Sequence, residues 1–377
     1  MLKSALLTLS LLCSGNLLAQ AADLTAEIKT VEALRGIRFL RTVQQKTISR
    51  QEFRSFLKTQ IDMNLPVPVD DYFSVLRALH LLGDEPEPLK KLFDLYEAQV
   101  VAFYDPRTHI YYSLDKPPVL ADQSMVPKSA VVVHELMHAL QDQHFGAWGI
   151  MEKRKLDWDS ELAYQAVLEG EATLVMMAAM FDSMDISFDG VIREDSMLQL
   201  LSDPKQFQVG IPADAPPYFV SSMIFPYIEG VKFVIQVYRR GGWKAVDSLH
   251  RKPPINTEEV LHPELYFARV GSGEPARLPS GGLINTHLGE FHWKYLLDEE
   301  AASGWASDDV RVMKGADGKM TVFIDSSWDS EKDAVEFSSA IATLLRKKGA
   351  APSVKTRGKR VLVAYGQDRN AVRKFVR

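Results

Sequence analysis

The chain of 377 residues contains a single cysteine, Cys13, which lies in the apolar stretch near the N-terminus. The rest of the sequence therefore offers no pair of thiols for a disulfide, no cysteine nucleophile and no thiolate ligand. The residue before the cysteine, Leu12, is not small, so we do not expect a lipid anchor at this position. Any metal ion would have to be held by His, Asp and Glu.

The sequence also lacks long runs of one charge. Its formal net charge is −5, and nothing in this balance favours nucleic acid as a partner. Residues 218–238 are apolar and long enough to cross a membrane, but they include Pro226, Glu229 and Lys232. Charged groups are costly inside a bilayer. We therefore expect a buried core helix here and no membrane span in the mature chain.

The N-terminus has the pattern of a secretory signal peptide. Lys3 precedes an apolar run from Ala5 to Leu12, and Ala19-Gln20-Ala21 provides small residues at the expected cleavage positions. The sequence thus predicts a signal peptide at residues 1–21, with cleavage after Ala21. It follows that the protein is expected to be exported, either to a periplasm or to the extracellular space.

Periodicity divides the remaining chain into three parts. Residues 22–98 repeat apolar positions at helical spacing, which predicts an all-helical N-terminal region. Residues 99–300 are expected to form the catalytic domain, which starts with a β-hairpin at 99–115. Residues 305–377 alternate strand-like and helix-like segments and predict a small α+β unit. The fold class expected is α+β and mainly helical.

One stretch, "VVVHELMHALQDQHF", carries the pattern of a metal site. His134 and His138 are four residues apart, so one face of a helix presents both imidazoles. Zinc binds neutral imidazole nitrogen at about 2.0–2.1 Å. Glu135 lies about 100° around the helix from His134, where it can act as a base beside the metal. The surrounding residues are apolar, which predicts a buried helix and makes these polar groups costly without a partner.

A third ligand is expected from the next apolar helix, residues 160–181. Glu169 and Glu171 are two residues apart and point in different directions on a helix, so at most one of them faces the metal. Gly170 and Ala172 beside Glu169 would let this helix approach the histidine helix closely. We therefore favour Glu169 over Glu171 as the ligand.

The H-E-x-x-H motif followed by a downstream E-G-x-A helix resembles the gluzincin metallopeptidases. The strings "HELMHALQDQHF" and "FPYIEGVKFV" also resemble a group of uncharacterised secreted bacterial proteins of this class. The resemblance implies a thermolysin-like minimal core, with a small sheet or hairpin, a histidine helix and a ligand-glutamate helix. In one place the chain departs from it. Thermolysin-like enzymes carry an Asp four residues after the ligand, where this chain has Thr173, and we expect Asp142 or a carbonyl to support a histidine instead.

The resemblance further implies one Zn²⁺ per chain and a peptide or protein substrate. A gluzincin binds an extended peptide along an edge strand, which the hairpin at 99–115 could supply. Glu135 would act as the general base for hydrolysis of the peptide bond. A donor to the developing oxyanion is also expected, and the candidates are Tyr227 in "FPYIEG" and His262 in "VLHPE".

Two other functions fit parts of the pattern. The first is a gluzincin-like scaffold that binds partners without catalysis, although it would have no need for Glu135. The second is a di-iron carboxylate oxidoreductase, since Glu135-x-x-His138 and Glu259-x-x-His262 are two E-x-x-H pairs. Pro263 directly follows the second pair, and a long bundle helix could not continue through this proline. Metal analysis separates one zinc ion from two irons.

Overall fold

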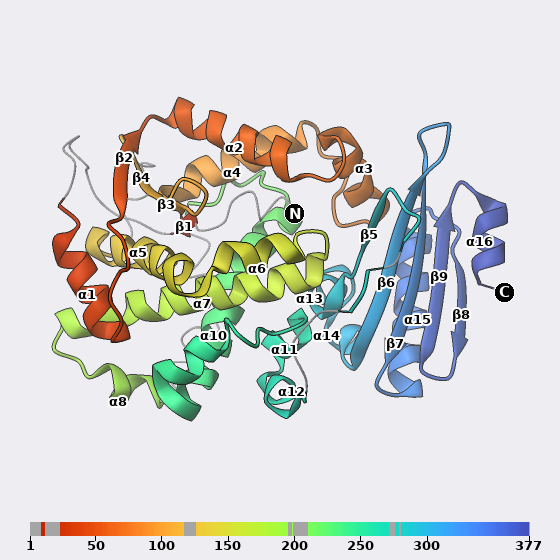
Figure 1. Ribbon diagram of the computed structural model, residues 1–377. Coiled ribbons are helices and arrows are strands. Elements are labelled where there is room, and N and C mark those ends of the chain that lie inside the picture. The colour runs from red at the N-terminus through yellow and green to blue at the C-terminus, as the bar shows by residue number, and fades with distance from the viewer. Residues whose placement is uncertain are drawn as a thin grey trace.

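A computed structural model describes residues 9–11, 23–116, 126–194, 198, 210–270, 276–278 and 280–376. Most of the predicted signal peptide lies outside these residues. The fold is mixed α+β and mainly helical, as the sequence predicts. A helical body carries a small sheet at one end and a five-stranded sheet at the other (Figure 1).

The N-terminal region is mostly helical, with α1 at Thr25–Arg35, α2 at Arg50–Asn64, α3 at Val69–Ala78 and α4 at Pro88–Gln99. Its prediction as all-helical was wrong at one element. Residues Gln44–Ile48 form strand β2, which pairs in parallel with β4, Ile110–Leu114. Since this pairing joins segments 66 residues apart, local periodicity could not reveal it.

The predicted hairpin is present as β3, Val100–Asp105, and β4, which pair antiparallel. A third strand, β1 at Leu9–Leu11, pairs antiparallel with the other edge of β3, so the sheet order is β1-β3-β4-β2. The side chains of β3 are buried. This sheet lies against α5, Lys128–Phe145, which is the histidine helix.

Helix α7, Trp158–Ser183, is the central element of the helical body. From Trp158 to Val175 every side chain is buried, because α5 packs on one side and α10, Pro217–Ser248, on another. The short helices α6, Ala147–Arg154, and α8, Phe188–Ile192, flank it. Helix α10 breaks at Gly241 and Gly242, whose backbone angles are not helical.

The close approach of α7 and α10 depends on glycine. A Cβ atom on Gly170 would overlap the backbone of Gly230, and a Cβ on Gly230 would overlap the carbonyl oxygen of Ala166. The expectation that Gly170 lets this helix approach the histidine helix is therefore wrong, because the close contact of Gly170 is with α10. Ala172 does face that helix and shares an apolar cluster with Val133 and Leu136.

The C-terminal sheet has the order β5-β6-β7-β9-β8. Its strands are β5, Ile284–Thr286; β6, Trp305–Lys314; β7, Met320–Trp328; β8, Ser353–Arg357; and β9, Arg360–Gly366. The helices of this half are α11, Thr257–Leu261; α12, Pro263–Ala268; α13, Gly289–Leu296; α14, Glu299–Ala302; α15, Glu331–Lys347; and α16, Arg369–Phe375. Since β5 comes from within residues 99–300, the C-terminal sheet reaches back across the expected domain boundary.

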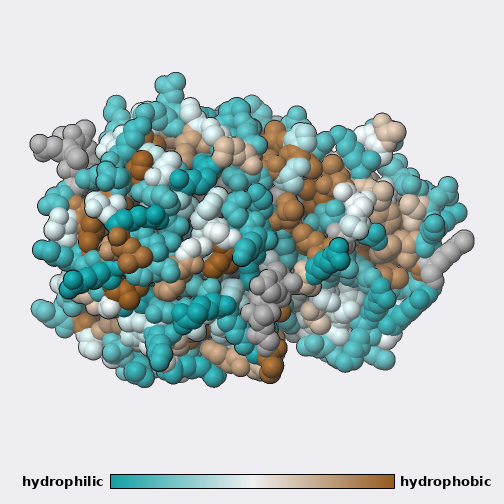
Figure 2. Space-filling model, viewed as in Figure 1, coloured by the Kyte–Doolittle hydropathy of each residue, from teal (hydrophilic) through white to brown (hydrophobic). Residues whose placement is uncertain are grey.

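The C-terminal sheet packs on the N-terminal helices. Lys314 Nζ lies 2.5 Å from the Asp71 carboxylate, and the Tyr365 hydroxyl donates to the carbonyl of Ala78 at 2.9 Å. One apolar cluster contains buried residues of α2, α3 and α4 together with residues of β6, β7 and β9. Hydrophilic residues cover most of the face seen in Figure 2, with apolar residues in smaller patches.

One helix in the described part of the chain, Pro217–Ser248, is long and apolar enough to cross a membrane by length and composition. However, 78% of its most apolar window is buried inside the protein. It packs against α7 (Figure 1). This is the arrangement expected of a core helix.

The close contact of α7 and α10 at Gly170 and Gly230, here called the glycine crossing, predicts a specific loss of stability. In Gly230→Ala, the added methyl group has no space, and we expect the free energy of unfolding to fall by about 1–3 kcal/mol. Gly149→Ala in α6 is the matched control, because nothing lies within 4 Å of the added Cβ. There we expect a gain of up to ~1 kcal/mol from helix propensity. Denaturant unfolding of both variants tests this, and equal stability of the two would contradict the crossing.

Candidate metal centre

Three of the sequence-predicted residues converge at one point between α5 and α7. The Nε2 atoms of His134 and His138 lie 3.1 Å apart, and Glu169 Oε2 lies 3.2 Å from the first and 3.4 Å from the second. Together they form the one group of three potential ligands that the described part of the chain brings within 4.8 Å. Glu171 is not in the group, so the geometry agrees with Glu169 as the candidate ligand.

These separations fit a tetrahedral zinc ion. Ligands about 2.05 Å from a tetrahedral centre are about 3.3 Å from one another, close to the three distances in the structure. The remaining oxygen of Glu169, Oε1, is buried and has no hydrogen-bond partner among the described residues. Buried polar atoms are seldom left unsatisfied. The three residues are therefore suited to hold one ion.

Electrostatics at the group favour a carboxylate. Burial by itself raises the pKa of Glu169, but the two imidazoles and their hydrogen bonds outweigh burial and lower that pKa to about 2. Burial lowers the pKa of His134, which favours its neutral imidazole, whereas at His138 the Glu169 and Glu135 carboxylates and the hydrogen bonds outweigh burial and raise the pKa. A neutral imidazole is the form that binds zinc.

Glu135 lies beside the group and is fully buried. Its Oε2 accepts a hydrogen bond of 2.7 Å from the backbone N–H of Tyr104 in β3. The carboxylate of Glu135 therefore points toward the sheet, beside the candidate metal ligands. This contact fixes the position of the candidate base relative to the strand.

Of the two candidate oxyanion donors, the structure brings Tyr227 to the histidines. Its ring stacks on that of His134 with centroids 6.0 Å apart. Burial, the carboxylates of Glu169 and Glu135, and a hydrogen bond to Glu169 raise the pKa of Tyr227 well above its usual value, so it stays a hydroxyl donor. His262 lies between α11 and α12, where Nε2 is 3.0 Å from Glu290.

The support of His138 comes from a residue that the sequence reasoning missed. Nδ1 of His138 lies 2.8 Å from Oε1 of Gln141, one turn further along α5. The amide nitrogen of Gln141 donates to Glu171 at 2.8 Å and to the carbonyl of Leu168 at 3.0 Å. Since the amide nitrogen is the donor there, Oε1 must accept from Nδ1–H. This leaves the Nε2 lone pair of His138 for an ion.

Glu171 is the centre of a second buried cluster behind the ligands. Arg35 from α1 donates to it at 2.7 Å and also contacts Asp247 at 2.5 Å. Nε2 of His250 lies 2.9 Å from the same carboxylate, and its Nδ1 lies 2.9 Å from the Tyr164 hydroxyl. Burial raises the pKa of Glu171, but Arg35 and His250 outweigh it and lower the pKa to about 2.

Asp142, the expected support for a ligand histidine, lies elsewhere. Its Oδ2 accepts from the Tyr104 hydroxyl at 3.0 Å, lies 2.9 Å from Nδ1 of His109 and pairs with Arg41 at 3.2 Å. It therefore joins α5 to the small sheet and to the segment after α1. The hydroxyl of Thr173 is buried and has no hydrogen-bond partner among the described residues.

Comparison with known proteins adds one match. A family model described as a domain of unknown function (DUF8575) matches residues 264–375. The matched region begins after His262 and covers the C-terminal sheet with its helices, so it excludes the metal group. No curated protein and no solved structure matches the chain.

The hydrogen bond to His138 predicts the effect of removing Gln141. In Gln141→Leu, the imidazole loses the acceptor that fixes its tautomer and orientation, and zinc affinity should fall about 10–100-fold. Gln143→Leu is the matched control on the same helix, since among the described residues Gln143 hydrogen-bonds with backbone groups of residues 40 and 41 alone. Competition with a fluorescent zinc chelator measures both affinities. Equal affinity in the two variants would refute the supporting role.

Proposed function

We propose that the protein is a zinc-dependent peptidase of the gluzincin type. The observation that carries the proposal is the convergence of His134, His138 and Glu169 within ligand distance, with Glu135 held beside them. When bound, Zn²⁺ supplies a Lewis acid and lowers the pKa of a coordinated water to about 7. Elemental analysis of the purified protein, with and without chelator treatment, tests for one zinc ion per chain.

The residues of the chain have separate tasks in this proposal. Glu135 accepts the proton of the attacking water and later donates it to the leaving amine. The Tyr227 hydroxyl, which its raised pKa keeps protonated, donates a hydrogen bond to the carbonyl oxygen as negative charge develops there. Burial of the group excludes other water and strengthens these interactions.

A peptide substrate is favoured by the strand beside α5. The edge of β3 that faces away from β4 is paired with β1, Leu9–Leu11, in antiparallel register. This strand belongs to the predicted signal peptide, and its cleavage after Ala21 would leave the edge available to an extended peptide. Backbone hydrogen bonds along such an edge bind peptides of many sequences. The proposal therefore includes export, with the leader removed in the active form.

The geometry weakens the di-iron alternative. A second iron would need the E-x-x-H pair of Glu259 and His262 to join the first group. Glu259 instead pairs with Arg269 at 2.5 Å, and His262 pairs with Glu290. A binding scaffold without catalysis is the remaining alternative. The hydrogen bond from the Tyr104 N–H holds the Glu135 carboxylate in place, which favours a role for Glu135 as general base over no role at all. A broad peptide screen in which the zinc-loaded protein cleaves nothing would favour the scaffold.

If Glu135 is the general base, its substitution should abolish hydrolysis without loss of the zinc ion. In Glu135→Gln, the side chain keeps its shape and its hydrogen bond to the strand but cannot accept a proton at neutral pH. We expect peptide hydrolysis to fall by about 10²–10⁴-fold while zinc remains at one per chain. Kinetics and metal content are measured on the same sample. Loss of zinc together with activity would make Glu135 a ligand or a structural residue.

The hydroxyl of Tyr227 predicts a second kinetic effect. Tyr227→Phe keeps the stack on His134 but removes the donor to the oxyanion, so kcat should fall by about 10²–10³-fold with KM nearly unchanged. The control is Tyr238→Phe on the same helix, whose hydroxyl bonds Asp189. An unchanged kcat in Tyr227→Phe would remove this residue from the mechanism.

A further inference from the structure

One residue of the small sheet contacts the histidine helix at two points, and one of these points is the candidate base. The backbone N–H of Tyr104 in β3 donates to Oε2 of Glu135 at 2.7 Å. The hydroxyl of the same Tyr104 donates to Oδ2 of Asp142 at 3.0 Å. Glu135 and Asp142 are seven residues apart, which corresponds to about 10 Å along the helix axis and about 20° around it. Tyr104 therefore spans two turns on one face of α5.

Two points of contact restrain a strand on a helix more than one does. A single hydrogen bond fixes one distance and allows the strand to pivot about it. A second hydrogen bond two turns away also fixes the position of β3 along α5. The ring of Tyr104 lies between the two points, is 1% exposed, and belongs to one apolar cluster with Leu136 and Ala139 of α5. Packing of this kind locks the conformation of a side chain that supports a functional group.

The second point of contact, at Asp142, is itself held by several groups. Nδ1 of His109 lies 2.9 Å from Oδ2 of Asp142, and Arg41 pairs with the same oxygen at 3.2 Å. His109 adopts a φ of 58°, in the left-handed region that favours glycine, so the hairpin turn places this imidazole at the carboxylate in a conformation that is unfavourable for its residue type. Burial and the Asp142 carboxylate raise the pKa of Tyr104 well above its usual value, which keeps its hydroxyl a donor.

This attachment is separate from the support of the metal ligands. Nδ1 of His138 lies against Gln141, whose amide nitrogen bonds to α7. Among the described residues, the carboxylate of Asp142 bonds instead to groups of β3, the hairpin turn and the segment after α1. Loss of the contact between Tyr104 and Asp142 should therefore disturb the base and leave the three ligands in place.

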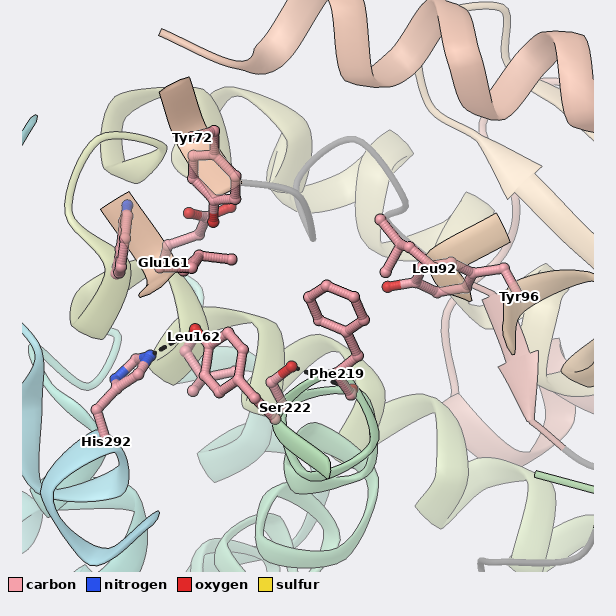
Figure 3. A pocket seen from close by; sticks show the side chains of 11 residues that line it. Tyr72, Leu92, Tyr96, Glu161, Leu162, Phe219, Ser222 and His292 are labelled. Carbon is pink, nitrogen blue, oxygen red and sulfur yellow. Dashed lines mark hydrogen bonds between the residues drawn. The ribbon is translucent and has the colours of Figure 1, made fainter. Parts of the chain in front are cut away.

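The pocket in Figure 3 is also separate from this attachment. Its lining residues come from α3, α4, α7, α10 and α13, and none of the described residues that line it belongs to α5 or to the small sheet. Its cavity of about 30 Å³ has room for about two water molecules. Changes at Tyr104 and Asp142 leave this pocket intact, so their effect on catalysis would come from the contact between β3 and α5.

We propose that Tyr104 and Asp142 are positioning residues for the candidate general base, and that their hydrogen bond lets β3 hold the Glu135 carboxylate at one place. The inference rests on the proposed peptidase function. Both residues act through Glu135. Without the hydroxyl, the strand keeps its N–H donor but loses its second attachment to the helix, so the distance from the carboxylate to the attacking water varies. Misplacement by about 1 Å costs up to about 10²-fold in rate.

A double-mutant cycle on the zinc-loaded protein tests the inference. Tyr104→Phe removes the hydroxyl and keeps the ring and the backbone N–H. We expect kcat to fall by about 10–100-fold, with KM within about twofold of the wild-type value and zinc at one per chain. In the Glu135→Gln background the same change should leave the residual kcat unaltered, because no base remains to be positioned. The matched control is Tyr112→Phe in β4, whose hydroxyl lies 3.4 Å from Thr108, and it should keep the wild-type kcat.

Two substitutions of Asp142 test the other end of the contact. Asp142→Leu removes the acceptor and should match Tyr104→Phe, whereas Asp142→Asn keeps an acceptor oxygen and should retain most of kcat. Hydrogen exchange at the amide of residue 104 supplies a measurement that needs no substrate. We expect this amide to exchange at least about tenfold faster in Tyr104→Phe and Asp142→Leu than in the wild type. In Tyr112→Phe its exchange should be unchanged.

The outcomes distinguish positioning from a structural role and from failure of the peptidase proposal. An equal fall of kcat in both backgrounds would make Tyr104 a structural residue and overturn the inference, and so would an unchanged kcat in Tyr104→Phe. If Tyr104→Phe does not fold, the two Asp142 variants decide by the same criteria. If the wild type cleaves no peptide, the proposed hydrolysis fails. The exchange rates at residue 104 then decide the attachment: faster exchange in the variants supports it, and equal exchange overturns it.

Discussion

The structure around the candidate site depends on one buried contact, between the Glu169 carboxylate and the imidazoles of His134 and His138. A carboxylate inside an apolar core is costly unless it is paired. Helices α5 and α7 therefore cannot slide past each other without exposing this charge to an apolar surface. The same contact orients the faces of both helices, so that Glu135 meets the sheet and Glu161 faces the N-terminal helices.

A second layer of polar groups supports this contact from behind. Gln141 lies between His138 and Glu171, and Arg35 balances the charge of Glu171. Hydrogen bonds and ion pairs in such a buried site are electrostatically stronger than in water. The apolar residues around them come from α5, α7 and the small sheet, which keeps water away from the network. The candidate metal ligands thus lie on a framework in which rotation of one imidazole disturbs several hydrogen bonds.

Local patterns were enough to predict part of this arrangement. The spacing of His134 and His138 and the apolar residues around them define a buried helix, and the hairpin follows from periodicity and turn residues. Glu169 required a guess between two glutamates, because helix geometry excludes one of them without saying which. Contacts between distant segments could not be read in this way. Arg35 and Glu171 are 136 residues apart, and β2 finds its parallel partner only in the folded chain.

Arg35 also connects the metal centre to the first helix of the described chain after the predicted leader. Docking of α1 buries its guanidinium between Glu171 and Asp247, so Arg35 reaches the Glu171 carboxylate behind His138 only when this helix is in place. Coupling between two binding events is reciprocal. An ion bound by His138 would therefore stabilise the docked position of α1. A chain in which α1 has not docked would bind the ion more weakly. In the proposed peptidase, the candidate centre would then assemble only after α1 has docked.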